Sequence, residues 1–471
     1  MRILVLESST TSAKAMLYSS EKGVLAIKIE TFLPEYSDIE TQDAEGIFQQ
    51  TARLGKQILN GQTVDMVALS GTWHSVLACD HSMKPVTRSY SWTYTGASSV
   101  AQRLRSNKEF VKKFYAATGC MVHATYPIFK LLHLREQGFR LEDCYFMGQG
   151  TYIFYRLTGQ YLLSESMASG SGLMNIHTKQ LDPDILRFLG VEENQFGKIV
   201  TYHDTRSLSE EGARLLGLKS GIPVITAHPD GSLNQVGVGA LGNGVMSFSV
   251  GTSAAIRMST SKPVLPEEPS TWCYLSPVAW MSGAATAGAC NCVDWVKDKM
   301  FPAGTTYKQI ESAEVDYEKL PVFLPFLYGE RCPGWHDENR ASFFDLTNSH
   351  SNVDLYFSTL EGVLFNIYQC FEVLCSINEM PTKIKLSGGI LNSKIWTQMC
   401  SDIFQQEMEC SKIEQMSMMG AAALAMELGG VLDDIRNLSV EQGVIIHPNP
   451  GKKELYAKKY ERYKYWYNKT M

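Results

Sequence analysis

Two short turns rich in Ser, Thr and Gly, one near the head of each half of the chain, limit most strongly what this sequence can fold into. SSTTSAK at 8–14 and SVGTSAA at 249–255 each join two apolar segments. The pattern predicts strand, turn and strand at both places. One such turn is typical of an ordinary hairpin. Two at corresponding positions indicate a duplicated domain, with two halves that face each other across a cleft.

The length and composition agree with this organisation. A chain of 471 residues is too long for one ordinary core, so we expect two domains, 1–243 and 244–471. Its hydrophobic content of 44% is typical of a globular protein, and the net charge of −6 argues against a nucleic-acid partner. No apolar run of membrane-spanning length or signal peptide is evident, and we expect no membrane partner. The 11 scattered cysteines predict free thiols in a reducing cytoplasm.

Strand-like and helix-like segments alternate in the N-terminal half of the chain. VDMVALSG at 64–71 predicts a buried strand, and IPVITAHPDG at 222–231 predicts an apolar strand that runs into a turn. Residues 353–374 have the length and pattern of a long helix. The basic, Tyr-rich tail at 452–471 predicts a packing helix with one solvated face.

Eight segments, in order along the chain, carry a resemblance to a known family. The chain resembles the FGGY carbohydrate kinases of the sugar kinase–actin-like ATPase superfamily, from the first hairpin to about residue 430. Within that family it is most similar to the gluconate kinases. The segments are SGTWHSVLACD, TGCMVHATYPIFKLLHL, YRLTGQYLLSESMASGSGLMNI, HPDGSLNQVGVGALGNG, SVGTSAAIR, FLPFLYGERCPGW, LSGGILNSKIWTQMCSDIF and MGAAALA.

The resemblance implies a fold and a reaction. It implies two actin-like (ribonuclease H-like) α/β domains with a central cleft. It also implies transfer of the ATP γ-phosphate, with Mg²⁺, to a hydroxyl of a small sugar or sugar acid. The assembly state, monomer or homodimer, stays open.

Asp230 is the candidate catalytic residue. It stands in HPDG, directly after an apolar segment. An acid followed by Gly is often only a turn-former. The resemblance implies instead a general base that accepts the proton of the sugar hydroxyl, and a metal ligand together with Glu7.

The same resemblance assigns the ATP side. It places the phosphates at both turns and the adenosine at LSGGILNS and MGAAALA, where Gly lets a backbone approach closely. Two of these residues have a plain structural alternative: a solvated strand position for Lys14 and close helix packing for Gly420. The residues are Thr10, Thr11, Lys14, Gly251, Thr252, Gly388, Gly389, Asn392 and Gly420.

The sugar side is expected in the first half. Thr72, Trp73 and His74 belong to SGTWHS, which matches the family's sugar loop, and Trp92 follows it. Trp73 is bulkier than the family's usual Met, and its ring offers a stacking face for a sugar.

Several positions depart from the family pattern. Glu7 replaces an Asp, and Ser9 replaces a Gly, which would remove tolerance of positive φ in the first turn. Tyr94 and Gly96 replace the Asp and Arg of Trp-x-Asp-x-Arg. Arg is the natural bidentate partner of a carboxylate, so its loss argues against gluconate.

Three functions therefore stay open. The leading one is an ATP-dependent kinase of a sugar acid, with gluconate as the first candidate. The second is a kinase of a neutral ketose or polyol such as xylulose, which fits the missing Arg better. The third is a diverged member that binds sugar or nucleotide without turnover. Phosphoryl transfer to a panel of aldonates, ketoses and polyols would separate them.

Overall fold

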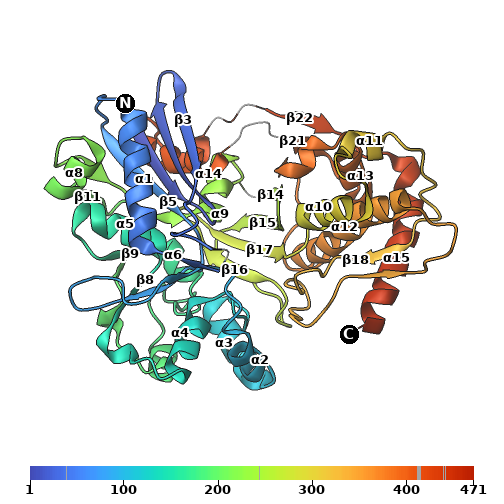
Figure 1. Cartoon of the computed structure of the whole chain (residues 1–471), viewed down its shortest axis with the longest axis horizontal. Coiled ribbons are helices and arrows are strands. Elements are labelled where there is room, and N and C mark those ends of the chain that lie inside the picture. Colours follow the sequence, from blue (N-terminus) through green and yellow to red (C-terminus); the bar gives the residue numbers. More distant parts are fainter. Residues whose placement is uncertain (39, 243, 411–414, 439, 441, 471) are drawn as a thin grey trace.

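The computed structural model describes residues 1–471 except 39, 243, 411–414, 439, 441 and 471. It has two lobes, and a seven-stranded mixed sheet lies in each half of the chain (Figure 1). The predicted fold of two α/β domains, each with a mixed sheet flanked by helices, is confirmed.

The first sheet is built around the first hairpin. Antiparallel β1 (Arg2–Ser8) and β2 (Ser12–Ser19) continue into β3 (Gly23–Thr31), and β5 (Met66–Gly71) runs parallel to β1. The strand order is β11-β12-β5-β1-β2-β3, and β13 also pairs with β5. The last three strands are β11 (Arg206–Ser207), β12 (Pro223–Val224) and β13 (His228–Pro229).

The second sheet repeats this plan. Its order is β16-β17-β15-β14-β20-β21-β22, with β14 antiparallel to β15 and parallel to β20. The run β17-β15-β14-β20 therefore matches β3-β2-β1-β5, which supports the duplication expected from the two turns. The strands are β14 (Val245–Val250), β15 (Ala254–Thr260), β16 (Trp272–Leu275), β17 (Trp280–Thr286), β20 (Lys383–Ser387), β21 (Met408–Cys410) and β22 (Val444–Ile446).

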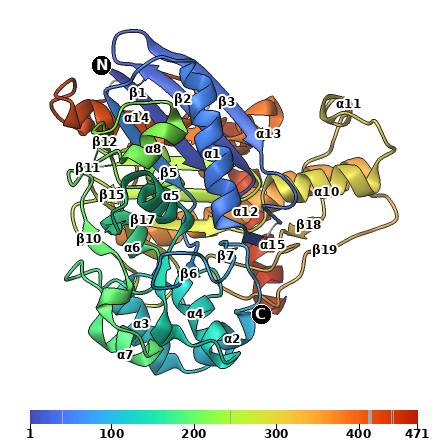
Figure 2. The ribbon, with the colours of Figure 1, turned by 60° about the vertical axis from the view of Figure 1, so that its left-hand side comes forward.

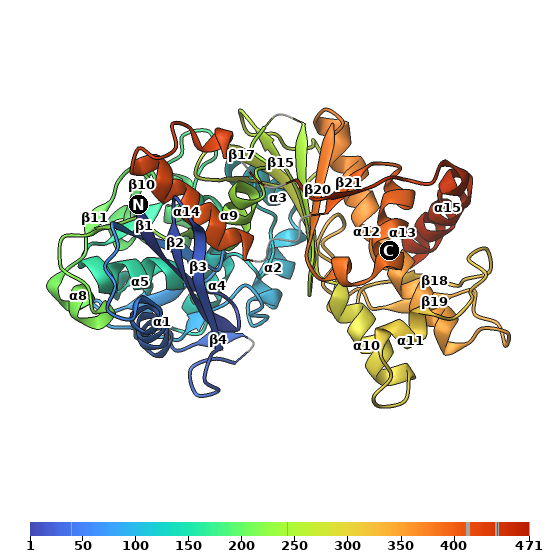
Figure 3. The ribbon, with the colours of Figure 1, turned by 90° about the horizontal axis from the view of Figure 1, so that it is seen from above.

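Alternate residues of β1 and β2 face two different cores, as the period of a strand requires. Leu4 and Leu6 pack with α1 (Ala44–Leu59), α5 (Gln149–Thr158) and α8 (Glu210–Leu216). Ile3 and Val5 pack with α9 (Asp230–Gly237) and α14 (Met416–Leu428). A helix from the C-terminal half thus completes the first domain (Figure 3). The boundary expected at 243 falls on a residue outside the described part of the chain.

The longer helices of the second domain, among the described residues, are α10 (Cys290–Met300), α12 (Asn352–Ile377), α13 (Lys394–Phe404) and α15 (Lys453–Thr470). The tail is the packing helix that was expected, because Tyr456, Tyr460, Tyr463 and Tyr467 are buried along α15. Helix α12 is long and apolar enough to cross a membrane, which the sequence survey missed. Since 67% of its most apolar window is buried inside the protein, we read it as a core helix.

A group of helices, α2 (Ser98–Arg105), α3 (Lys108–Thr118) and α4 (Pro127–Glu136), lies below the first sheet in Figure 2. It shares one core with the second domain. The remaining short elements are β4 (Thr41–Gln42), β6 (Leu77–Cys79), β7 (Ser89–Tyr90), β8 (Tyr145–Met147), β9 (Leu162–Ser164), α6 (Glu165–Ser169), α7 (Pro183–Leu189), β10 (Lys198–Val200), α11 (Tyr307–Glu311), β18 (Val322–Leu324) and β19 (Ser342–Phe344).

The strand predicted at 222–231 is wrong in detail. The structure has two short strands there, β12 and β13, and Asp230 is the first residue of α9 rather than part of a turn.

Candidate active site

A cavity of about 230 Å³ lies between the two halves of the chain. Both hairpins reach it, with Thr10 from the first turn and Ser253 from the second. The structure therefore brings together six of the residues predicted from sequence on the sugar and phosphate sides. The lining residues are Thr10, Thr72, Trp73, His74, Trp92, Asp230, Gly231, Ser253, Ala255, Arg257, Trp272, Tyr274, Ala285 and Arg331.

Asp230 lies half-buried at the start of α9, where the chain enters from β13. Its Oδ1 accepts a hydrogen bond from the backbone N–H of Gly231, at 2.7 Å. Burial, and next the nearby negative charge of Glu7, raise the pKa of Asp230 to about 6. A carboxylate with such a pKa is suited to accept a proton near neutral pH.

Glu7 is more enclosed than a plain metal ligand would be, since it is only 1% exposed. Its Oε1 lies 2.7 Å from the Lys14 ammonium. Its Oε2 accepts hydrogen bonds from the hydroxyls of Ser70 and Ser417, at 2.7 and 2.5 Å. For Glu7 to bind Mg²⁺ and Lys14 to bind the phosphates, as predicted, each side chain must either share its present partners with the new ligand or give them up.

The first turn does not need a glycine at position 9. Ser9 donates its backbone N–H and its hydroxyl to the carbonyl of Ser12, both at 3.0 Å. Ser9 is not among the described residues with positive φ. The lost tolerance of positive φ therefore has no cost in this turn, because the serine closes it with its own side chain.

The sugar loop is held in one conformation by buried hydrogen bonds. Trp73 donates its indole N–H to the carbonyl of Ser166, at 2.9 Å. His74 has a φ of 65°, and its Nδ1 lies 2.6 Å from the Gly170 carbonyl. Burial lowers the pKa of His74 to about 3, so the ring is neutral. Because a carbonyl can only accept, Nδ1 carries the hydrogen and Nε2 is an acceptor.

Further hydrogen bonds connect this loop and the residues around it. Lys130 donates to the carbonyls of His74 and Ser91, both at 2.6 Å. Trp92 donates its indole N–H to the hydroxyl of Thr10, at 2.9 Å, which links the sugar side to the first turn. Thr72 donates to the carbonyl of Ser8, at 3.3 Å. The predicted sugar residues therefore act partly as structural anchors.

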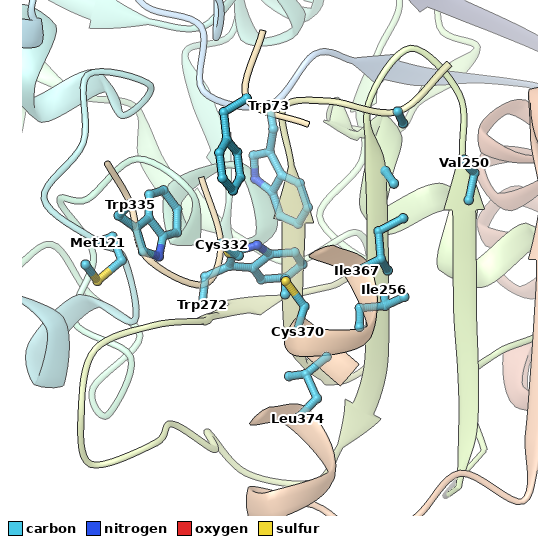
Figure 4. Packing of buried hydrophobic residues seen from close by; sticks show 14 of the residues in the cluster. Trp73, Met121, Val250, Ile256, Trp272, Cys332, Trp335, Ile367, Cys370 and Leu374 are labelled. Carbon is cyan, nitrogen blue, oxygen red and sulfur yellow. The ribbon is translucent and has the colours of Figure 1, made fainter. Parts of the chain in front are cut away.

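Aromatic rings form the wall between the halves. Trp73 lies 4.8 Å from Tyr274 between ring centroids, and Tyr274 stacks on Trp272 at 4.2 Å. Figure 4 shows Trp73 and Trp272 close together, with Trp335 beside them. This wall joins the sugar loop to β16 and provides an apolar face at the edge of the cavity.

The nucleotide side brings β14 against the loop after β20. Gly388 has a φ of 97°, and a Cβ there would lie 2.4 Å from the carbonyl oxygen of Val250. A Cβ on Gly389 would lie 2.9 Å from Cys290 Sγ. Thr252 and Asn392 are exposed. The paired glycines thus allow two backbones to touch beside the second turn.

Gly420 lies where α14 crosses α9. A Cβ at this position would lie 2.0 Å from the carbonyl oxygen of Leu233. Close helix packing, the alternative noted from the sequence, therefore accounts for this glycine. Its predicted role at the adenine stays a prediction.

Two cavity residues, Arg257 and Arg331, were missed by the sequence reasoning. Arg257 follows Ser253 and Ala255 on one face of β15, while Ala254 and Ile256 are buried on the other. This alternation was the signal that could have identified Arg257. Arg331 lies in the irregular segment between β18 and β19, where no periodic pattern marks it.

Comparison with known proteins decides the family. The model of the N-terminal domain of the FGGY family of carbohydrate kinases matches residues 2–237, and that of the C-terminal domain matches 246–427. This chain belongs to the FGGY family of carbohydrate kinases. It is therefore a phosphotransferase that uses an alcohol group as acceptor.

Curated relatives of this FGGY kinase include gluconokinases and xylulose kinases. It is 29% identical to a gluconokinase of Bacillus subtilis, over 93% of this chain and 89% of the relative. It is 28% identical to a gluconokinase of Bacillus licheniformis, over 98% and 93%. A xylulose kinase of Escherichia coli is 24% identical, over 86% and 85%.

A gluconate kinase structure from Lactobacillus acidophilus superposes on this FGGY kinase with a TM-score of 0.93 at 26% identity. The match covers 99% of this chain and 97% of the other. A xylulose kinase structure from the same organism also gives 0.93 at 26% identity, over 99% and 98%. The predicted family and fold are thus confirmed.

The departure at Tyr94 and Gly96 of this FGGY kinase has a local explanation. The Tyr94 ring lies 4.6 Å from Tyr90 between centroids. A Cβ on Gly96 would lie 2.2 Å from the Tyr94 hydroxyl oxygen. Tyr94 therefore occupies the space that a side chain at 96 would need, so an Arg there would require the Tyr94 ring to move.

Proposed function

We propose that this protein transfers the γ-phosphate of ATP to a hydroxyl of gluconate, with Asp230 as the general base. The observation that supports the proposal most is the position of Asp230, in a cavity that both hairpin turns and the sugar loop line. The similarity of the whole chain to gluconokinases favours gluconate as the acceptor.

In this mechanism the protein orients the acceptor and moves one proton. Thr72, Trp73, His74 and Trp92 line the acceptor side, and the neutral His74 has Nε2 free to accept a hydroxyl hydrogen. Asp230 takes the proton of the attacking sugar hydroxyl. At the same time the hydroxyl oxygen bonds to the γ-phosphorus, and the bond from this phosphorus to ADP breaks. Enclosure between the lobes limits transfer to water.

The ATP-binding residues belong to the same proposal. The two turns supply backbone N–H groups, hydroxyls and the Lys14 ammonium to the phosphates, and the glycines after β20 let the nucleotide approach. The proposed residues are Thr10, Thr11, Lys14, Gly251, Thr252, Gly388, Gly389, Asn392 and Gly420.

The residues present fit a magnesium ion that arrives with ATP. No group of three or more His, Cys, Asp and Glu side chains suited to a metal occurs among the residues that the structure describes. A nucleotide-bound Mg²⁺ needs only one or two carboxylates, because phosphates and waters complete its shell. Asp230 and Glu7 are the proposed ligands. When bound, Mg²⁺ neutralises charge on the phosphates.

A neutral ketose is the second candidate acceptor. A xylulose kinase structure superposes on this chain as well as a gluconate kinase does. Gly96 also leaves the usual Arg position without a charge.

The proposal includes a cytoplasmic location, in keeping with the 11 unpaired thiols. We propose that the protein is either a monomer or a homodimer. Sedimentation analysis would distinguish the two states.

A panel assay tests the function. ADP release is measured with gluconate, xylulose and glucitol as acceptors, and phosphorylated products are confirmed by mass spectrometry. We expect the highest kcat/KM with gluconate. A clear preference for xylulose or glucitol would reject gluconate, and no transfer to any sugar would reject the kinase mechanism.

A further inference from the structure

We propose that Arg257 and Arg331 together form the subsite that binds the carboxylate of a sugar-acid acceptor. This pair would replace the Arg that the family usually carries at position 96 and would set the preference for a charged acceptor over a neutral one. The inference rests on the proposed function and deepens it. Four observations carry it.

The first observation is the position of Arg257. Its guanidinium reaches the cavity from β15, and Nη2 lies 3.3 Å from where a Cβ on Gly231 would be. Among the described residues, the guanidinium makes one hydrogen bond, and it is long, 3.4 Å from Nη1 to the Ser249 hydroxyl. Its Nε is buried and has no hydrogen-bond acceptor among the described residues. Arg257 therefore has donor capacity that the protein does not use.

The second observation is that Arg331 has the same unused capacity. Its Nε is also buried without an acceptor in the described part of the chain. The guanidinium carbon lies 5.9 Å from the centre of the Trp335 ring. Both arginines line the one cavity that also contains Asp230.

The third observation concerns how the Arg331 segment is held. Asp337 accepts from Arg105 at 2.7 Å and lies 2.7 Å from His123 Nε2. Arg105 also donates to the carbonyl of Trp335. These contacts tie the segment 331–337 to the helices of the first half. They therefore hold the backbone of the segment that carries Arg331.

The fourth observation is electrostatic. Burial lowers the pKa of Arg257 to about 10. The negative charge of Asp230 opposes this shift, and the positive charge of Arg331 adds to it. Asp230 is the acidic side chain lining the same cavity, and it faces two guanidiniums. Enclosed charges of like sign are costly unless an anion pairs with them. The free site therefore favours a ligand that carries a negative charge.

A carboxylate matches this chemistry better than a neutral sugar. Each guanidinium presents N–H groups in a planar fork that fits two carboxylate oxygens. The phosphates of ATP are assigned to the turn at 251–253, whereas Arg257 lies beyond Ala255 on the same strand face, farther from that turn. We therefore assign the arginines to the acceptor rather than to the nucleotide.

Binding of a matched pair of acceptors tests the subsite. Gluconate and gluconamide have the same size, but the amide carries no charge. Titration calorimetry without ATP measures both with the wild type, Arg257→Gln and Arg331→Gln. We expect the wild type to bind gluconate about 10- to 100-fold more tightly than gluconamide. Each variant should lose most of that preference while its affinity for gluconamide changes little.

Two controls separate recognition from folding. Arg187→Gln removes a guanidinium that is 76% exposed on α7, and it should keep the preference for gluconate. Arg257→Lys and Arg331→Lys keep the charge without the planar fork, so they should restore part of the preference that the Gln variants lose. Retained binding of gluconamide shows that each variant is folded.

The outcomes separate this inference from the proposed function. Equal affinity of the wild type for gluconate and gluconamide would overturn the subsite, even if both are phosphorylated. Unchanged gluconate preference in both Gln variants would also overturn it. A wild type that prefers gluconate in binding, loses this preference in the variants and yet phosphorylates neither acceptor would support the subsite and reject only the kinase proposal.

Discussion

Glu7 and Lys14 lie directly opposite each other in the β1–β2 pair and form an ion pair, with 2.7 Å between Oε1 and Nζ. The longer Glu side chain also reaches Ser70 and Ser417, so it joins the first hairpin to β5 and α14. Glu7 contributes to the raised pKa of Asp230 as well. Glu7, which replaces the family's Asp, thus interacts both with Lys14 after the first turn and, through its charge, with Asp230, the proposed base.

Glu7→Gln should change the pH dependence and the Mg²⁺ dependence of turnover together. Removing the negative charge lowers the pKa of Asp230, so the acidic limb of kcat/KM should move to lower pH. The Mg²⁺ concentration for half-maximal rate should rise. Glu21→Gln, on the exposed β2–β3 turn, is the matched control. If both dependences stay as in the wild type, Glu7 is a bystander.

The wild-type pH profile should report Asp230 in the free enzyme. Because its pKa is raised to about 6, the base is increasingly protonated as pH falls through that value. We expect kcat/KM to fall about tenfold per pH unit below pH ~6 and to be level above it. The same limb with gluconamide as acceptor would exclude titration of the substrate. A profile that stays level down to pH ~4 would contradict the assignment.

Asp337→Asn should loosen the segment that carries Arg331. The hydrogen bond from His123 and the charge of Arg105 outweigh burial and hold the pKa of Asp337 far below its usual range. The free energy of unfolding should fall by about 1–3 kcal/mol at pH 7, and gluconate affinity should fall with it. This stabilisation should be present above pH ~4 and be lost as the pH falls further.

The matched control for Asp337→Asn is Asp184→Asn, which breaks an exposed ion pair with Arg187. Such pairs contribute little, so its free energy of unfolding should stay within about 0.5 kcal/mol of the wild type. Urea unfolding measures both variants. Equal stability of the two would show that Asp337 does not hold the segment.

Gly420→Ala should destabilise the crossing of α9 and α14. The added methyl would lie 2.0 Å from the Leu233 carbonyl oxygen, so the two helices must separate. We expect a loss of about 1–3 kcal/mol by thermal or urea unfolding. At Gly242 a Cβ meets only Val245 Cγ2, at 3.7 Å, so Gly242→Ala is the control. A wild-type Tm for Gly420→Ala would refute the packing role.

Local patterns predicted much of this molecule. The two hairpins were predictable because strand, small-residue turn and strand are encoded within about 20 residues each. Asp230 was predictable because its surroundings match a family. The packing of α14 on the first sheet was not, because it joins residues more than 400 positions apart, such as Glu7 and Ser417.

The acceptor site was predicted only in part. Loss of the Arg at position 96 argued against gluconate, but the structure provides Arg257 and Arg331 in the same cavity. The sequence alone could not indicate this, because Arg257 and Arg331 line one cavity only in the folded chain. The part that Ser9 plays in the turn could not be predicted for a related reason, since its hydrogen bonds to Ser12 depend on the geometry of the turn.

Turnover of the Asp230→Asn variant tests the central claim most directly. Asn keeps the shape of the side chain and removes its basicity. With gluconate and ATP, kcat should fall by about 10²- to 10⁴-fold, while ATP affinity and Tm stay close to those of the wild type. Near-normal turnover of a folded Asp230→Asn enzyme would contradict the assignment of Asp230 as the general base.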